Sequence, residues 1–368
     1  MHLRPPALAA DPAAGPLAQR LARPPARLAL ATLPTPIERA PWLDGRRSEV
    51  WIKRDDRTSG LYGGGKVRKL EWVLANPPYR DDDDERGAAP IVSVGGTGSH
   101  HLVALALFLA DLGRELHGLV FTQPWTPHVV RNFAVLVSKN ARLWITRTRV
   151  GLPLQWLAYR SWRSPQRRGV DMGPGASTPL GCFGFVEAGL ELAGQVAAGE
   201  LPPPDDLYVA CGSAGTAAGL ALGLGLAGLR PRLHLVSSVE WWAFNRVLLD
   251  RKIAATWAAL AHHGLIDPPR EASSLLDGIE LVVDHAEVGD GYGAPTPAGL
   301  FEVERARDHG LVLETTYTAK CVAALRRDGA DADHPRTVLF WNTHGNNDLS
   351  PHIDPDWRAR SPIDVPDL

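Results

Sequence analysis

A lysine follows a run of three glycines in the segment S-G-L-Y-G-G-G-K-V-R-K-L-E, which covers residues 59–71. Glycine lets the backbone turn tightly and approach a ligand closely. A lysine at such a turn could form a Schiff base with an aldehyde, and Lys66 is one of only six lysines in the chain. The alternative is a solvated lysine at the start of a helix, because Val67, Leu70 and Leu74 have helical spacing.

A second glycine-rich segment, Y-V-A-C-G-S-A-G-T-A-A-G-L at residues 208–220, joins a short apolar strand to a helix. It presents backbone N–H groups, hydroxyls and a helix N-terminus to one point, which suits a phosphate. It is neither a Walker A loop nor a dinucleotide-binding motif, and tight packing is the alternative interpretation. The candidate phosphate ligands are Gly212, Ser213, Ala214, Gly215 and Thr216.

A third segment, S-V-G-G-T-G-S-H-H-L at residues 93–102, ends a strand in a glycine-rich turn and places Ser99 at a helix N-cap position. Two anion cradles and one lysine fit a small-molecule site with a phosphate at one end and a carboxylate at the other. His100 and His101 are adjacent, and adjacent side chains on a helix do not face one ligand. The spacing therefore predicts no metal site.

Composition sets broad limits on the class of protein. The 368 residues are 45% hydrophobic and 22% charged, which predicts a globular chain of about two domains. A formal charge of −2 gives no reason to expect a nucleic acid or a membrane surface as partner. Three cysteines without CxxC spacing indicate a reduced, cytoplasmic protein. Neither a secretory leader nor an apolar segment long enough to span a bilayer is expected.

Apolar runs separated by turn residues predict strands that alternate with helices. The expected strands cover residues 49–53, 91–94, 116–121, 143–146, 207–210, 233–237 and 338–341. The expected helices cover residues 66–75, 99–112, 128–139, 183–198, 216–226, 297–309 and 318–327. Alternation of this kind predicts α/β layers around parallel sheets. We also expect a charged loop over 80–89 and a crossing between two lobes over 173–184.

In this order the segments resemble the fold-type II pyridoxal-phosphate-dependent enzymes, the tryptophan synthase β superfamily. Within it the chain looks most like the D-cysteine desulfhydrase and 1-aminocyclopropane-1-carboxylate deaminase group. The Lys66 segment resembles the family's Schiff-base segment, usually G-G-N-K-x-R-K-L-E. Further resemblances are L-P-T-P-I-E-R (33–39), W-I-K-R-D-D (51–56), P-G-A-S-T-P-L-G-C-F-G-F-V (174–186), G-Y-G-A-P-T-P (291–297), Y-T-A-K (317–320) and F-W-N-T-H-G (340–345).

The resemblance implies an α/β fold with two open twisted sheets, mostly parallel, with flanking helices and pyridoxal 5'-phosphate between a large and a small domain. We expect an extended arm at 1–30, a large domain from 31–75 plus 181–368, and a small domain at 76–180. The expected protein is a cytoplasmic homodimer that acts on a small amino acid.

The resemblance also implies roles for the first three segments. Lys66 would hold the cofactor and act as the base that moves the substrate α-proton. The loop at 212–216 would bind the cofactor phosphate. Ser99, with His100 and His101 beside it, would bind the substrate carboxylate, and His100 stands where the family has an asparagine near the phenolic oxygen of the cofactor.

Further side chains match family positions around the substrate and the pyridine ring. Tyr292 and Tyr317 would orient the substrate amine or assist proton transfer, with core packing as the alternative. Thr343 falls where desulfhydrases place a threonine near the pyridine nitrogen, and Thr318 falls where the cyclopropane deaminases carry a glutamate. His344, in place of a glycine, would put a bulky group near the pyridine face.

The expected reaction is α,β-elimination of the D-cysteine desulfhydrase kind, which gives a 2-oxo acid and ammonia. A carboxylate keeps the pyridine nitrogen protonated, whereas a hydroxyl does not. Hydroxyl partners therefore favour substrates with a leaving group at Cβ over opening of a cyclopropane. Two alternatives remain: a β-replacement synthase that uses the same chemistry, and a degenerate relative that binds a ligand without turnover. The departures His100 and His344 would favour the degenerate relative.

Overall fold

The computed structural model describes residues 15–80, 89–162, 169–268, 271–329 and 334–367. Its larger sheet has six strands in the order β1-β2-β10-β7-β8-β9. These are β1 (Ile37–Arg39), β2 (Ser48–Lys53), β7 (Asp206–Cys211), β8 (Arg232–Ser237), β9 (Leu281–Asp284) and β10 (Arg336–Trp341). Only the β1–β2 pairing is antiparallel. The strands in its middle are buried on both faces, as expected for a parallel sheet.

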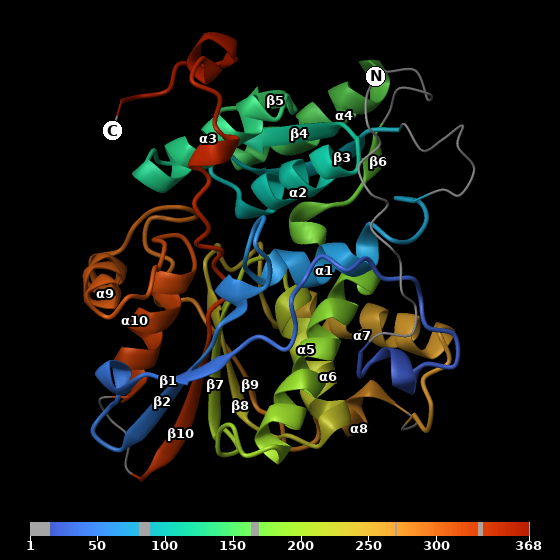
Figure 1. Ribbon diagram of the computed structural model, residues 1–368, viewed down its shortest axis with the longest axis vertical. Helices are drawn as coiled ribbons and strands as arrows, with labels where there is room; N and C mark the ends of the chain where they lie inside the picture. Colours follow the sequence, from blue (N-terminus) through green and yellow to red (C-terminus); the bar gives the residue numbers. More distant parts are fainter. Residues whose placement is uncertain (1–14, 81–88, 163–168, 269–270, 330–333, 368) are drawn as a thin grey trace.

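The smaller sheet has four parallel strands in the order β5-β4-β3-β6. They are β3 (Ile91–Gly96), β4 (Leu116–Phe121), β5 (Arg142–Thr146) and β6 (Val170–Asp171). In Figure 1 this sheet and its helices form a separate layer above the larger sheet. The strands of the smaller sheet lie within 76–180, and those of the larger sheet lie in the two flanking segments.

Helices cover both sheets (Figure 1). They are α1 (Gly65–Val73), α2 (His100–Asp111), α3 (Pro127–Ser138), α4 (Leu152–Trp162), α5 (Pro179–Ala197), α6 (Gly215–Ala227), α7 (Arg246–His262), α8 (Ala272–Leu276), α9 (Pro297–Asp308) and α10 (Thr318–Gly329). The main core forms where α5 and α6 pack on the larger sheet. Helix α1 packs against α2, so the glycine-rich turn before α1 lies where the two layers meet.

The α/β fold with two mostly parallel sheets is confirmed, and every expected strand and helix is present within a few residues of its expected bounds. The elements that we did not predict are β1, β6, β9, α4, α7 and α8. The three strands have two to four residues each, too few for a clear alternation of apolar and polar side chains. Helix α7 exposes most of its surface and buries only four of its 17 residues, so its apolar stripe is narrow.

Both ends of the described chain pack onto the fold. Residues 15–30 differ from the loosely structured arm that we expected, because Leu17 and Leu21 join the core of the larger sheet and Arg27 pairs with Glu71 and Glu187. Near the other end, Trp357 packs against α3 of the smaller sheet. Residues 1–14 and most of the charged loop, at 81–88, lie outside the described residues. None of the described helices is both long and apolar enough to cross a membrane.

Candidate active site

A cavity of about 270 Å³ lies between the two sheets, at the carboxyl ends of β3 and β7. Ligands of parallel α/β sheets bind at such ends. All the site residues predicted from the sequence line this cavity except Gly215, which lies directly behind its wall. The predicted lining residues are Lys66, Ser99, His100, His101, Gly212, Ser213, Ala214, Thr216, Tyr292, Tyr317, Thr318, Thr343 and His344.

Lys66 occupies the second position of α1 and its side chain lines the cavity. Burial lowers the pKa of its ammonium below the usual value, although the charge of Glu314 acts in the opposite direction. Four of the other five lysines bond elsewhere: Lys53 to Glu191, Lys69 and Lys252 to Ser177, and Lys320 to Val288. A buried amine with a lowered pKa is suited to act as a nucleophile.

Gly65 stands where the family usually has asparagine, and packing explains this departure. A Cβ at this position would lie 2.7 Å from the Phe185 ring and 3.3 Å from Cγ2 of Thr343. The Gly65 N–H donates to the Thr343 carbonyl at 3.1 Å and ties the glycine turn to the segment after β10. A side chain at position 65 would therefore displace its neighbours. The glycine lets Lys66 and Thr343 lie close together on the cavity wall.

The loop between β7 and α6 has the shape expected of a phosphate cradle. Ala214 is the N-cap of α6 and adopts a left-handed conformation with φ of 62°. The Ser213 hydroxyl lies at the cavity wall and hydrogen-bonds the Ser177 hydroxyl at 2.7 Å. The first N–H groups of a helix have no partner within the helix, so α6 presents donors to an anion at this loop.

The sequence reasoning missed Lys69 as part of this cradle. Its side chain is 1% exposed, and its ammonium donates to the Ser177 hydroxyl at 3.0 Å. Burial, together with the nearby charge of Lys66, lowers its pKa to about 7. Among the described residues no carboxylate pairs with Lys69, so an anion bound in the cradle would supply the counter-charge that keeps this amine protonated. The spacing of Lys66 and Lys69, three residues apart on one helix face, was the available signal.

Replacement of Gly215 with valine is expected to weaken cofactor binding. A Cβ there would lie 2.4 Å from the Ser177 hydroxyl and 2.9 Å from the Lys69 ammonium, so both must move. Overpacking of this kind costs about 1–3 kcal/mol, which corresponds to a loss of about tenfold or more in affinity. Cofactor retention during dialysis measures the effect. Gly194→Val is the control, because a Cβ there meets nothing within 4 Å; equal retention in the two variants would refute the role.

The turn after β3 forms a second polar wall. Ser99 caps α2, as predicted, and its hydroxyl accepts from the Leu102 N–H at 3.3 Å. His101 places Nε2 2.8 Å from the Ser93 hydroxyl, and burial lowers its pKa to about 3. A neutral His101 cannot supply positive charge to a carboxylate. The α2 N-terminus and Ser99 are therefore the stronger candidates for binding one.

Tyr292 and Tyr317 meet at the cavity. The Tyr317 hydroxyl donates to the Tyr292 hydroxyl at 3.0 Å, and the two rings pack edge to face. Burial raises the pKa of both phenols, and the neighbouring phenol raises that of Tyr317 further. Both groups are therefore protonated at neutral pH and can donate hydrogen bonds to a bound substrate.

A carboxylate that the sequence reasoning missed, Glu314, also lines the cavity. It accepts hydrogen bonds from the N–H groups of Thr316, Tyr317 and Thr318 at the start of α10. The Thr318 hydroxyl donates to the same carboxylate at 3.3 Å. We expected hydroxyl partners for the pyridine nitrogen and did not predict this carboxylate on the cavity wall.

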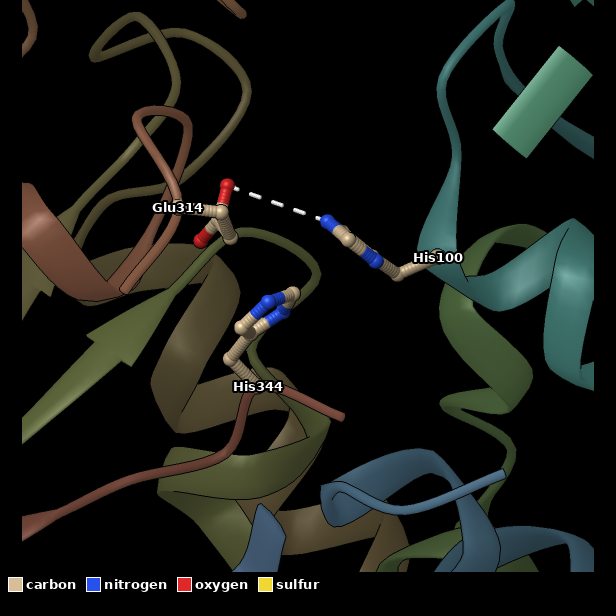
Figure 2. Close-up of side chains that lie close together, drawn as sticks. All are labelled: His100, Glu314 and His344. Carbon is tan, nitrogen blue, oxygen red and sulfur yellow. Dashed lines mark ion pairs between the residues drawn. The ribbon is translucent and has the colours of Figure 1, made fainter. Parts of the chain in front are cut away.

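Figure 2 shows that Glu314 faces two histidines, His100 and His344. Nε2 of His100 lies 3.8 Å from the Glu314 carboxylate, and its Nδ1 lies 3.0 Å from the Tyr62 hydroxyl. Burial acts to raise the pKa of Glu314, but its interaction with His100 outweighs burial and holds that pKa well below the usual range. Burial lowers the pKa of His344 to about 3, so this ring is neutral at neutral pH.

Arg149 closes one side of the cavity and joins the two layers. It follows β5 of the smaller sheet, pairs with Glu240 beyond β8 of the larger sheet, and lies over the rings of Tyr292 and Trp242. The sequence reasoning did not select Arg149, because neither its spacing nor its context marks it among many arginines.

The chain is similar to known proteins of one family. The model of the pyridoxal-phosphate-dependent enzyme family matches residues 28–343. D-cysteine desulfhydrases from Salmonella choleraesuis and Salmonella paratyphi C are each 32% identical over 345 residues, which cover 89% of this chain and 97% of theirs. The solved structure of an ACC deaminase homologue has the same fold, with a TM-score of 0.69, 24% identity, and coverage of 88% of this chain and 93% of that one.

The chain belongs to the family of pyridoxal-phosphate-dependent enzymes. The site fits the cofactor that defines this family. An aldehyde requires a reactive amine, and Lys66 provides one on the cavity wall. A phosphate requires donors and positive charge, which the α6 N-terminus, Ser213 and the buried Lys69 provide together.

Proposed function

We propose that the protein is a lyase that removes the β-substituent and the amino group of a small amino acid and releases a 2-oxo acid and ammonia. The observation that carries the proposal is the position of Lys66, a buried amine in a cavity with a phosphate cradle and a carboxylate-binding turn. The similarity to D-cysteine desulfhydrases supports the reaction type.

Each part of the proposed chemistry has a candidate residue. The bound cofactor supplies an electron-withdrawing ring that stabilises negative charge at the substrate Cα. Lys66 would hold the cofactor and take the proton from Cα. Ser99 and the α2 N-terminus would fix the substrate carboxylate. The phenols of Tyr292 and Tyr317, both protonated, would orient the substrate amine or supply a proton to the leaving group.

D-cysteine and β-chloroalanine are expected to release a 2-oxo acid, whereas 1-aminocyclopropane-1-carboxylate is not. Elimination needs a leaving group at Cβ, which the first two substrates have. Thr318 stands at the position where the cyclopropane deaminases carry a glutamate, and its hydroxyl donates to Glu314. A panel of D- and L-amino acids, with detection of the 2-oxo acid, measures the preference. Efficient opening of the cyclopropane by the wild-type chain would contradict the proposal, and Thr318→Glu tests whether that position sets the preference.

We further propose a cytoplasmic homodimer. The three cysteines are free and buried, which fits a reducing compartment. Among the described residues, the adjacent Trp241 and Trp242 expose 70% and 52% of their surface, and tryptophan is enriched at protein–protein interfaces. Sedimentation equilibrium distinguishes a dimer from a monomer.

A further inference from the structure

Three side chains in the cavity form a cluster that the proposed reaction does not use as a unit. We define the His–Glu–His cluster as His100, Glu314 and His344, which come from the start of α2, the turn before α10 and the segment after β10 (Figure 2). One ligand atom of each lies within 4.8 Å of the others. The resemblance to the family gives asparagine and glycine at the two histidine positions, so both imidazoles are departures of this chain.

Both imidazoles present unpaired nitrogens inside the protein. Nε2 of His100 and Nδ1 of His344 are buried and have no hydrogen-bond partner among the described residues. His344 is 4% exposed. An unpaired buried acceptor is costly unless a ligand binds it. Each ring therefore has a buried nitrogen that is free to bind a cation.

Surrounding groups hold the cluster in place. Nδ1 of His100 lies 3.0 Å from the Tyr62 hydroxyl, so a proton on Nδ1 leaves the lone pair on Nε2. Three backbone N–H groups fix the Glu314 carboxylate, and its Oε2 accepts only from Thr316 among them. Oε2 is the oxygen that faces His100, at 3.8 Å. Metal-binding histidines and carboxylates are typically oriented by such partners.

We propose that the His–Glu–His cluster binds a divalent transition-metal ion of the zinc class in the cofactor-loaded protein. Two neutral imidazoles and one carboxylate are the ligand set of catalytic zinc sites, which keep a further position open. Tetrahedral ligands at about 2.05 Å lie roughly 3.3 Å apart. The 3.8 Å between Nε2 and Oε2 is close to that value, and small side-chain rotations bring the third atom into range. The proposal goes beyond the proposed lyase activity and does not depend on it.

The charges around the cluster suit one cation. Glu314 is the one carboxylate among the three proposed ligands. His128 stacks on His100 from α3, with ring centroids 5.7 Å apart. Among the described residues, Arg131, Lys66 and Lys320 are basic groups that act electrostatically on residues of the cluster. These basic groups raise the cost of a second ion, so we expect one ion per chain.

A titration of the cofactor-loaded protein with Co²⁺ tests the proposal. One equivalent is expected to bind and to give the visible bands of a Co²⁺ ion with nitrogen and oxygen ligands. His100→Asn and His344→Gly remove one ligand each and restore the family's residue. Loss of a residue that only hydrogen-bonds to a metal ligand weakens metal binding by about 10–100-fold. Loss of a ligand itself should have a larger effect, so each variant is expected to weaken binding at least about 100-fold. His262→Ala is the control, since His262 is an exposed histidine of α7.

Cofactor content, measured by released phosphate in the same samples, separates this test from that of the proposed function. Saturation by one equivalent without loss of cofactor, abolished in both ligand variants and retained in His262→Ala, supports the site. No saturable binding, or binding unchanged in His344→Gly, overturns it. Displacement of the cofactor by Co²⁺ also overturns it, because the ion is proposed to bind beside the cofactor.

Discussion

Lys66→Ala is expected to lower turnover by at least about 10³-fold, because general-base catalysis alone contributes about 10²–10⁴-fold. The variant also loses the amine that would hold the cofactor, while the cradle around Ser213 and Lys69 stays intact. The fold should keep its stability, because removal of a buried ammonium relieves a desolvation penalty. The rate of 2-oxo acid release, with far-UV circular dichroism as the check on folding, measures the effect.

Lys69→Ala is the matched control, since Lys69 lies one helical turn from Lys66. It should lower cofactor affinity and leave the covalent attachment on Lys66. Borohydride reduction of the wild-type protein followed by peptide mapping should label Lys66. A label on Lys53, Lys69 or Lys320 instead would refute the assignment, as would a Lys66→Ala variant with near wild-type turnover.

The parts of the site that follow strands were predictable from the sequence. The loop after β7 and the turn after β3 each join an apolar run to a glycine-rich turn and a helix, and this order is a local property of the chain. Carboxyl ends of parallel strands gather at one edge, so such loops meet. The Lys66 turn joins them because α1 packs between the two layers.

The residues that were missed depend on contacts between distant segments. Glu314 faces His100, which lies more than two hundred positions earlier, and nothing in its own segment indicates a cavity. Tyr62 matters because its hydroxyl meets His100. His100 and His344 are also distant in the sequence, although their ring centroids lie 4.9 Å apart. The spacing of the adjacent histidines His100 and His101 therefore gave no information about this pair.

The N-terminal segment shows a related limit. Its proline, alanine and arginine content predicts a loose arm, yet Arg27 donates to Glu71 at 2.7 Å and to Glu187 at 2.8 Å, both buried. The composition of this segment cannot show that Glu71 in α1 and Glu187 in α5 are buried and pair with Arg27. Burial acts to raise the pKa of Glu187, and although Arg27 opposes this, the value reaches about 7.

Arg68→Ala is expected to destabilise the protein by about 3–5 kcal/mol, the usual cost of removing one partner from a buried ion pair. Arg68 is 1% exposed and binds Asp55 at 2.7 Å and Glu191 at 2.9 Å. Its loss leaves the Asp55 carboxylate buried, with neutral donors such as the Trp341 indole at 2.8 Å as its remaining hydrogen-bond partners among the described residues. Because Arg68 lies on α1, the turn that carries Lys66 should loosen as well. Urea unfolding at neutral pH measures the change in the free energy of unfolding.

Arg57→Ala is the control for this prediction, because Arg57 and its partner Glu38 are 49% and 39% exposed and such pairs contribute about 0–1 kcal/mol. A loss for Arg68→Ala no larger than that of Arg57→Ala would contradict the buried network. Equal losses would mean that water or a rearranged side chain replaces the guanidinium at little cost.

The pH dependence of the same variant tests which carboxylate Arg68 stabilises. Burial acts to raise the pKa of Glu191, but Arg68 and Lys53 outweigh burial and lower it to about 2. A folded-state pKa below the unfolded value of about 4.5 stabilises the protein above pH 4.5, and this contribution is lost as the pH falls towards 2. Without Arg68 the pKa of Glu191 should rise towards its usual value.

The difference in unfolding free energy between the wild type and Arg68→Ala should therefore be constant above about pH 5 and shrink between about pH 4.5 and 2. A difference that stays constant down to pH 2 would show that Arg68 acts through packing and not through the charge of Glu191.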